Sequence, residues 1–238
     1  MRDYSLPTHK ECLAILAEYH VPPHIVNHSK AVAKLAIFLA RRLNENGAEV
    51  DIALIEGACL LHDLLRVHDF KESDYVRFEQ NLPEQVRAKW QRLHTKYKST
   101  PHELAAYDIL KEKYPTLALT IKRHRYMALL DEKDRLNSWE EKLLYYADMR
   151  VMHDKIMPLK QRLIEAHKRN IHMHGSAVQS KINTAKVDPL IFQMEKEIFE
   201  KIGLDPLEVT EEFIDSHSTS HTRPPLRNKS WLIVKKDS

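Results

Sequence analysis

The chain has 238 residues, of which 43% are hydrophobic and 30% charged, and its formal net charge is +3. This composition is typical of a folded protein with a substantial core, and the charge is too small to predict nucleic-acid binding. Only 4 glycines occur, which argues against glycine-rich phosphate loops and against a turn-dense all-β fold. We expect Cys12 and Cys59 to be reduced core residues of a cytoplasmic protein, since no segment predicts a signal peptide or a membrane span.

Helical periodicity runs through the sequence and predicts an all-α fold. Asp51 and Ser138 are expected to cap the helices that follow them, and Gly47 and Gly203 to end the helices that precede them. The polar stretch 171–186 is expected to be a connection. The predicted helices cover residues 8–20, 25–43, 51–65, 86–97, 102–114, 116–126, 139–153, 159–170 and 188–202.

The stretch "CLLHDLL", residues 59–65, places a histidine and an aspartate in an apolar helix. His62 shares a helical face with Ile55 and Cys59, and Asp63 lies at the rim of that face. A buried ionised carboxylate is costly unless a charge or hydrogen bonds compensate it. Either the pair lies at a helix end in water, or a positive charge meets Asp63 inside the fold.

Four other predicted helices each place one histidine or aspartate on their apolar face. One such histidine is more often a hydrogen-bonded core residue than a ligand, but a set from five helices favours a metal site. Neutral imidazoles and carboxylates are ligands of divalent transition metals, and an ion would also supply the charge that Asp63 needs. The four additional candidates are His28, His102, His124 and Asp148.

Over residues 20–165 the chain resembles the HD-domain metal-dependent phosphohydrolases. "VNHSKAVAKLAIFLA", "GACLLHDLLR" and "KLLYYADMRVMHDKI" look like the first-histidine, His-Asp and last-aspartate segments of that family. "TPHELAAYDIL" and "IKRHR" look like the extra-histidine segments of its binuclear subgroup, which includes bacterial hydrolases of symmetrical dinucleoside tetraphosphates. The chain reads His-Asp-Leu-Leu where the common variant reads His-Asp-Ile-Gly.

The resemblance implies an all-helical fold, one or two divalent ions and a phosphoester or phosphoanhydride substrate. Iron, manganese, nickel and zinc all suit such ligands. A divalent ion lowers the pKa of bound water, which predicts hydrolysis of a phosphate ester or anhydride, and we expect a nucleotide substrate. The implied ligands of the first ion are His28, His62, Asp63 and Asp148. The implied ligands of the second ion are His102 and His124, with Asp63 as the bridge.

Cations near the ions should stabilise charge that develops on phosphoryl oxygens. Arg66, one turn after His62, is the first candidate, and with Asp63 it is predicted to act in catalysis. The dipeptide His153-Asp154 is expected to support or cap rather than to bind an ion. The run "KWQRLHTKYK", 89–98, suits either a nucleotide or, more simply, an exposed amphipathic helix. Other basic candidates are Lys122, Arg123, Arg125, Arg150 and Lys155.

We predict a hydrolase domain over residues 1–165, with 66–100 as a lid, and a helical extension with a partly mobile tail over 166–238. The short stretch "WLIVKK" in that tail either pairs as a strand or stays mobile. The expected partner is a small phosphorylated molecule, with no membrane and no nucleic acid, and a homodimer is compatible with the sequence. Two other functions remain open: a cyclic-nucleotide or cyclic-dinucleotide phosphodiesterase, and a nucleotide sensor without turnover.

Overall fold

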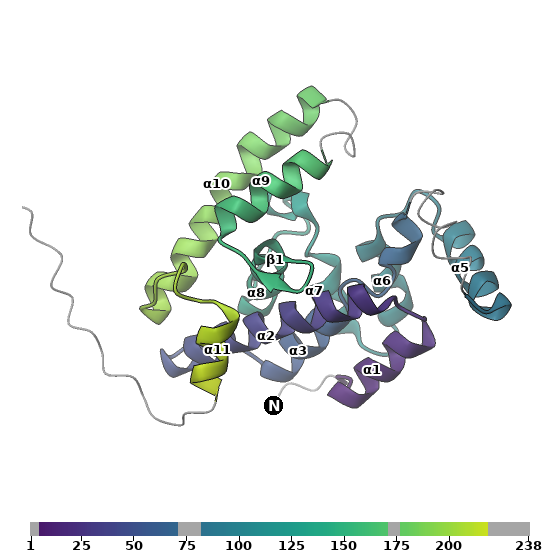
Figure 1. Cartoon of the computed structure of the whole chain (residues 1–238), viewed down its shortest axis with the longest axis horizontal. Helices are drawn as coiled ribbons and strands as arrows, with labels where there is room; N and C mark the ends of the chain where they lie inside the picture. Colours follow the sequence, from purple (N-terminus) through teal and green to yellow (C-terminus); the bar gives the residue numbers. More distant parts are fainter. Residues whose placement is uncertain (1–4, 71–81, 171–176, 219–238) are drawn as a thin grey trace, which may run out of the picture.

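The computed structural model describes residues 5–70, 82–170 and 177–218, and nearly all of its regular structure is helical (Figure 1). The all-α prediction is therefore confirmed. The α-helices in these ranges are α1 (His9–Glu18), α2 (Pro23–Glu45), α3 (Ile52–Leu61), α5 (Glu84–Lys96), α6 (His102–Leu110), α7 (Pro115–Lys122), α8 (Trp139–Arg150), α9 (Leu159–Asn170), α10 (Ala177–Ile202) and α11 (Glu211–Ser218). Two 3-10 helices, η1 (Arg66–Asp69) and η2 (Tyr126–Leu130), and an antiparallel hairpin of β1 (Val151–Met152) and β2 (Lys155–Ile156) accompany them.

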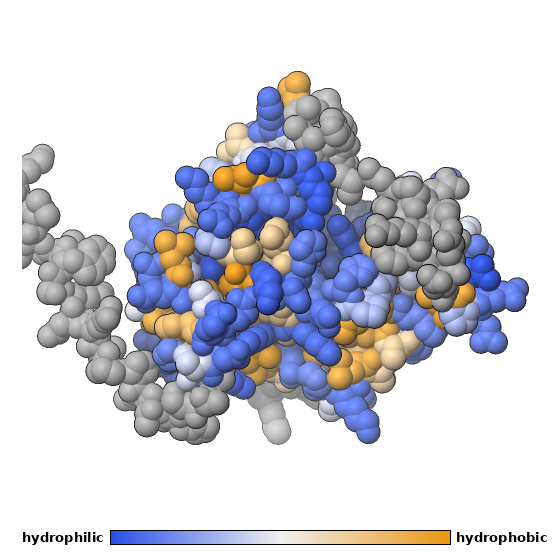
Figure 2. Space-filling view, in the orientation of Figure 1, coloured by the Kyte–Doolittle hydropathy of each residue, from blue (hydrophilic) through white to orange (hydrophobic). Residues whose placement is uncertain are grey.

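The core is centred on α2, which packs against both α3 and α8. Leu35, Leu39 and Leu43 of α2 recur at four-residue spacing and are fully buried. Each buried leucine side chain contributes about 1.5–3 kcal/mol through loss of contact with water. α3 is apolar almost all round, and most of its side chains are buried. The surface of the molecule in Figure 2 is mainly hydrophilic, with scattered apolar side chains.

Two N-caps fix where the central helices begin, as the sequence predicts. The Asp51 carboxylate accepts hydrogen bonds from the backbone N–H groups of Ala53 and Leu54 at the start of α3. Ser138 and Glu141 form a reciprocal capping box at the start of α8. These caps fix the first turns of α3, which leads into His62 and Asp63, and of α8, which carries Asp148.

Several predicted helices have different limits in the structure. The helix expected over 51–65 ends at Leu61, and the helix expected over 139–153 ends at Arg150, where the chain turns into the β1–β2 hairpin. Arg150 is buried there and donates from Nη2 to the carbonyl of Pro206, and from Nε to that of Met157. These carbonyls hold the guanidinium at the point where α8 stops.

The polar stretch 171–186 was expected to be a connection, but α10 begins at Ala177. α10 also continues through Pro189, because Val187 and Ile191 on either side of it are fully buried and hold the helix against the core. Residues 171–176 of the expected connection lie outside the described residues.

α10 and α11 both pack on α2, and α9 packs on α8 (Figure 1). The division predicted at 165/166 stays a prediction, and α9 runs across it. Within the predicted lid, η1 and α5 pack together, and residues 71–81 lie outside the described residues. The stretch "WLIVKK" in the C-terminal tail also lies outside them. None of the helices in the described part of the chain is both long and apolar enough to cross a bilayer.

Candidate metal centre

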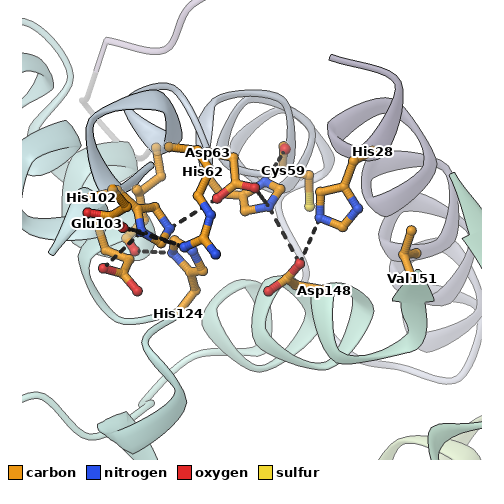
Figure 3. Close-up of polar contacts among 12 residues, drawn as sticks. His28, Cys59, His62, Asp63, His102, Glu103, His124, Asp148 and Val151 are labelled. Atoms are coloured by element: carbon orange, nitrogen blue, oxygen red, sulfur yellow. Dashed lines mark hydrogen bonds and ion pairs between the residues drawn. The ribbon is translucent and has the colours of Figure 1, made fainter. Parts of the chain in front are cut away.

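Six predicted side chains converge between the central helices (Figure 3). α2 carries His28 and α8 carries Asp148, while the His62-Asp63 pair directly follows α3. His102 opens α6 and His124 follows α7 by two residues. Their potential ligand atoms form three overlapping groups, in each of which all atoms lie within 4.8 Å of one another. The groups are His28, His62 and Asp63; His62, His124 and Asp148; and Asp63, His102 and His124.

Three of the four imidazoles are held by backbone carbonyls on the side that faces away from this centre. A carbonyl oxygen only accepts, so the hydrogen lies on Nδ1 and Nε2 is the nitrogen directed to the carboxylates. This is the arrangement that orients a histidine ligand. The Nδ1–oxygen distances are 2.8 Å from His28 to the carbonyl of His153, 2.7 Å from His62 to that of Cys59, and 2.6 Å from His124 to that of Ile121.

The fourth imidazole, His102, is held by a carboxylate. Its Nδ1 lies 2.6 Å from Oδ2 of Asp69, and its Nε2 lies 3.0 Å from Oδ1 of Asp63. Arg66 Nη1 also lies 3.0 Å from Nδ1, and 3.5 Å from the same oxygen of Asp69. Glu103 Oε2 lies 3.5 Å from Nδ1 and is buried with no hydrogen-bond partner in the described part of the chain.

On the inner side, the carboxylates of Asp63 and Asp148 lie between the imidazoles. His28 Nε2 lies 2.9 Å from Asp148 Oδ1. The His62 ring is fully buried, yet its Nε2 has no hydrogen-bond partner among the described residues. That atom lies 3.7 Å from Asp63 Oδ2 and 3.6 Å from Asp148 Oδ1. A divalent ion between this buried ring nitrogen and the two carboxylates would satisfy all of them, so the donor set fits a metal.

The electrostatics of the protein chain alone show the same need for positive charge. Burial lowers the pKa of His62 and of His102, but the neighbouring carboxylates outweigh it and raise these pKa values to about 9 and about 10. Burial raises the pKa of Asp63 and of Asp148, but the neighbouring histidines hold both well below the usual range. Burial and the charge of His62 lower the pKa of His124 to about 4, so His124 is neutral at pH 7.

Of the predicted cations, Arg66 contacts His102, and most others have partners elsewhere. Lys122 and Arg125 pair with Asp134, and Arg123 with Glu141. Arg150 is buried at the end of α8, as described above, and Lys155 is exposed.

The dipeptide His153-Asp154 supports the site through its backbone. The carbonyl of His153 accepts from Nδ1 of His28, and the residue has a φ of +57° at the tip of the hairpin. In the run 89–98, Trp90 is buried and donates from Nε1 to the carbonyl of Tyr19, which anchors one face of the amphipathic helix α5.

Sequence reasoning missed Asp69 and Glu103. Asp69 lies in η1, a 3-10 turn in a segment with weak periodicity, so its spacing from His62 gives no helical face to read. Glu103 follows a histidine at the first turn of α6, where acidic residues are common for reasons of helix capping. One sequence signal for Asp69 was that His68-Asp69 repeats the His-Asp dipeptide of residues 62–63 shortly after it.

The fold and this site define an all-α protein with a histidine- and aspartate-lined centre suited to divalent metals. The family described as "HD domain" matches residues 25–152, more than half of the chain, and the chain belongs to this family of metal-dependent phosphohydrolases. HD domains bind divalent metal ions.

One curated relative is a tRNA (cytidine(56)-2'-O)-methyltransferase of Thermoplasma volcanium. The chain is 34% identical to it over 61 residues, which are 26% of this chain and 17% of the methyltransferase. The match therefore covers a small part of that protein. No solved structure matches the chain.

Proposed function

We propose that the protein is a metal-dependent phosphohydrolase that cleaves a phosphate ester or anhydride, with a nucleotide as substrate. One observation carries this proposal: six side chains from five segments meet, and Nε2 of His28, His62 and His102 lies within 3.7 Å of a carboxylate of Asp63 or Asp148. A binding module without turnover has no need for such a constellation. Membership of the HD-domain family supports the same reaction class.

In this proposal the six residues hold two ions. The first ion would be held by His28, His62, Asp63 and Asp148, and the second by Asp63, His102 and His124. Asp63 faces His62 with one oxygen and His102 with the other, which suits a bridging role. The ions supply a water of lowered pKa and charge to neutralise phosphoryl oxygens.

The residues of the chain then have distinct tasks. The carbonyls behind His28, His62 and His124 keep each Nδ1 protonated, so that no proton competes for Nε2 in the neutral ring. Arg66 is partly exposed at the His102 end of the site, and its guanidinium can donate to phosphate oxygens in fork geometry. The buried walls around His62 lower the local dielectric and strengthen these interactions.

Turnover by the metal-free and the metal-loaded protein tests this function. We expect hydrolysis of bis(p-nitrophenyl) phosphate after loading with manganese or iron, and little after chelation. A panel of nucleotides with dinucleoside polyphosphates and cyclic nucleotides then identifies the substrate. A preference for cyclic substrates would favour the phosphodiesterase alternative, and nucleotide binding without turnover in the loaded protein would favour a sensor.

Two histidine variants provide the matched comparison. His62→Ala should lose metal-dependent turnover, because it removes a fully buried potential ligand. His167→Ala should keep it, because His167 pairs with Asp188 away from the six residues. Equal activity in both variants would contradict the proposal.

A further inference from the structure

A polar cluster surrounds Nδ1 of His102 on the side that faces away from the proposed ions. Asp69 Oδ2 lies 2.6 Å from Nδ1, Arg66 Nη1 lies 3.0 Å from it, and Glu103 Oε2 lies 3.5 Å from it. Neither Asp69 nor Glu103 belongs to the six proposed ligands. Their closeness to one ring nitrogen requires an explanation, because the neutral imidazole that binds a metal ion has only one hydrogen to give.

Asp69 and Arg66 make opposite demands on that nitrogen. A carboxylate only accepts, so Asp69 favours the ring form with the hydrogen on Nδ1. A guanidinium only donates, so Arg66 favours the form with a bare Nδ1 and the hydrogen on Nε2. The second form would place a hydrogen where the proposed second ion binds. The short contact to Asp69 favours the first form, and it also draws Arg66 toward the carboxylate, since Arg66 Nη1 lies 3.5 Å from Asp69 Oδ2.

Glu103 is a poor substitute for Asp69. Within the described ranges its Oε2 is buried without a hydrogen-bond partner, and its distance of 3.5 Å from His102 Nδ1 is at the outer limit for a hydrogen bond. Asp69 follows Asp63 by six residues, so one short segment supplies both the proposed bridging ligand and the carboxylate behind His102. The backbone from Asp63 through η1 therefore sets the distance between these two carboxylates.

We propose that Asp69 is a positioning residue for the second metal ion: it selects the form of His102 whose Nε2 is free to bind, against the opposing donor Arg66. This inference rests on the proposed two-ion site. It assigns to η1 a role beyond the connection between α3 and α5. Loss of a carboxylate that hydrogen-bonds a metal-binding histidine lowers metal affinity by about 10- to 100-fold.

Cobalt titration of the full-length metal-free protein tests this role without any need for turnover. We expect the wild-type protein to bind two equivalents, followed by the visible absorption of the bound ion. In Asp69→Ala the second equivalent should bind about 10- to 100-fold more weakly while the first is unchanged. Asp188→Asn is the matched control, since Asp188 accepts from His167 at 2.9 Å with similar exposure, and it should bind both equivalents normally.

Two further variants separate a positioning role from a general loss of structure. Removing the opposing donor in Asp69→Ala/Arg66→Ala should restore part of the second-ion affinity, which a merely misfolded site would not do. Asp69→Asn keeps the shape but loses the charge, and should weaken the second ion several-fold; if Asp69→Ala does not fold, this variant decides.

If the Asp69 variants bind the second cobalt ion with unchanged affinity, the positioning role of Asp69 is overturned and the two-ion site remains intact. A wild-type protein that binds one ion at most would instead overturn the two-ion site, and the role of Asp69 with it. Two bound ions without turnover would count against the proposed function alone.

Discussion

Loading the metal-free protein with divalent ions should release about two protons at pH 7. The reason lies in the pKa values of about 9 for His62 and about 10 for His102, which the nearby carboxylates raise against the effect of burial. Both rings are therefore imidazolium ions in the metal-free protein at pH 7. A metal ion binds only the neutral ring, so each of these two residues must give up its Nε2 proton.

The free-energy cost of removing these protons follows from the difference between the two pKa values and pH 7. The two protons are lost from groups whose pKa values lie about two and about three units above pH 7, and each unit is worth 1.36 kcal/mol. Displacing both therefore costs on the order of 7 kcal/mol, and the joint affinity for two ions should rise about 100-fold per pH unit below pH 9. His124, with a pKa of about 4, contributes no proton at pH 7.

Calorimetric titration in buffers of different ionisation enthalpy measures this release directly. The slope of the observed enthalpy against buffer enthalpy gives the number of protons, which should be about two at pH 7 and about one near pH 9.5. Release of less than one proton at pH 7, or an affinity that does not change with pH, would refute the reasoning. Either result would mean that His62 and His102 do not both lose a proton when the metal ions bind.

Asp63→Ala should abolish metal-dependent turnover and lower bound metal in elemental analysis, because it removes the proposed bridge; full turnover would count against the site. His124→Ala should reduce metal stoichiometry from two ions to one, and unchanged stoichiometry would exclude His124 as a ligand. Gly57→Ala should lower the free energy of unfolding in urea by about 1–3 kcal/mol, since its Cβ would lie 2.8 Å from Leu117 Cδ1; an unchanged midpoint would mean that this side chain moves aside without cost. His153→Val should lower that free energy by about 1–2 kcal/mol more than His153→Gly does, because φ is +57°; equal urea midpoints would show that the turn stores no strain.

The helical fold could be predicted because its periodicity is dense and its caps are explicit. Asp51 and Ser138 begin α3 and α8 as expected, since their short side chains accept hydrogen bonds from the first turn. The end of α8 was not visible in the sequence. It depends on Arg150, whose carbonyl partners belong to Met157 and to the distant Pro206. Such long-range bonds leave no local pattern.

The six candidate ligands were predictable because the sequence pattern places each of them on, or at the rim of, an apolar helical face, where a polar side chain is costly without a partner. In the structure His62, Asp63 and His124 come just after α3 and α7. Their convergence is what the sequence could not establish, and the structure brings all six together. Asp69 lacked any such contrast, since it lies in a single 3-10 turn that presents no regularly spaced apolar face, and its partner His102 is far along the chain. The carbonyl of His153 was equally invisible, because a backbone atom contributes through the path of the chain and not through residue type.

The most direct test of the account is a crystal structure of the manganese-loaded protein with anomalous scattering recorded for the metal. We expect two anomalous peaks bridged by the Asp63 carboxylate, with His28, His62 and Asp148 around one and His102 and His124 around the other. Peaks elsewhere on the surface, or an empty centre with the two carboxylates still paired to imidazolium rings, would contradict it.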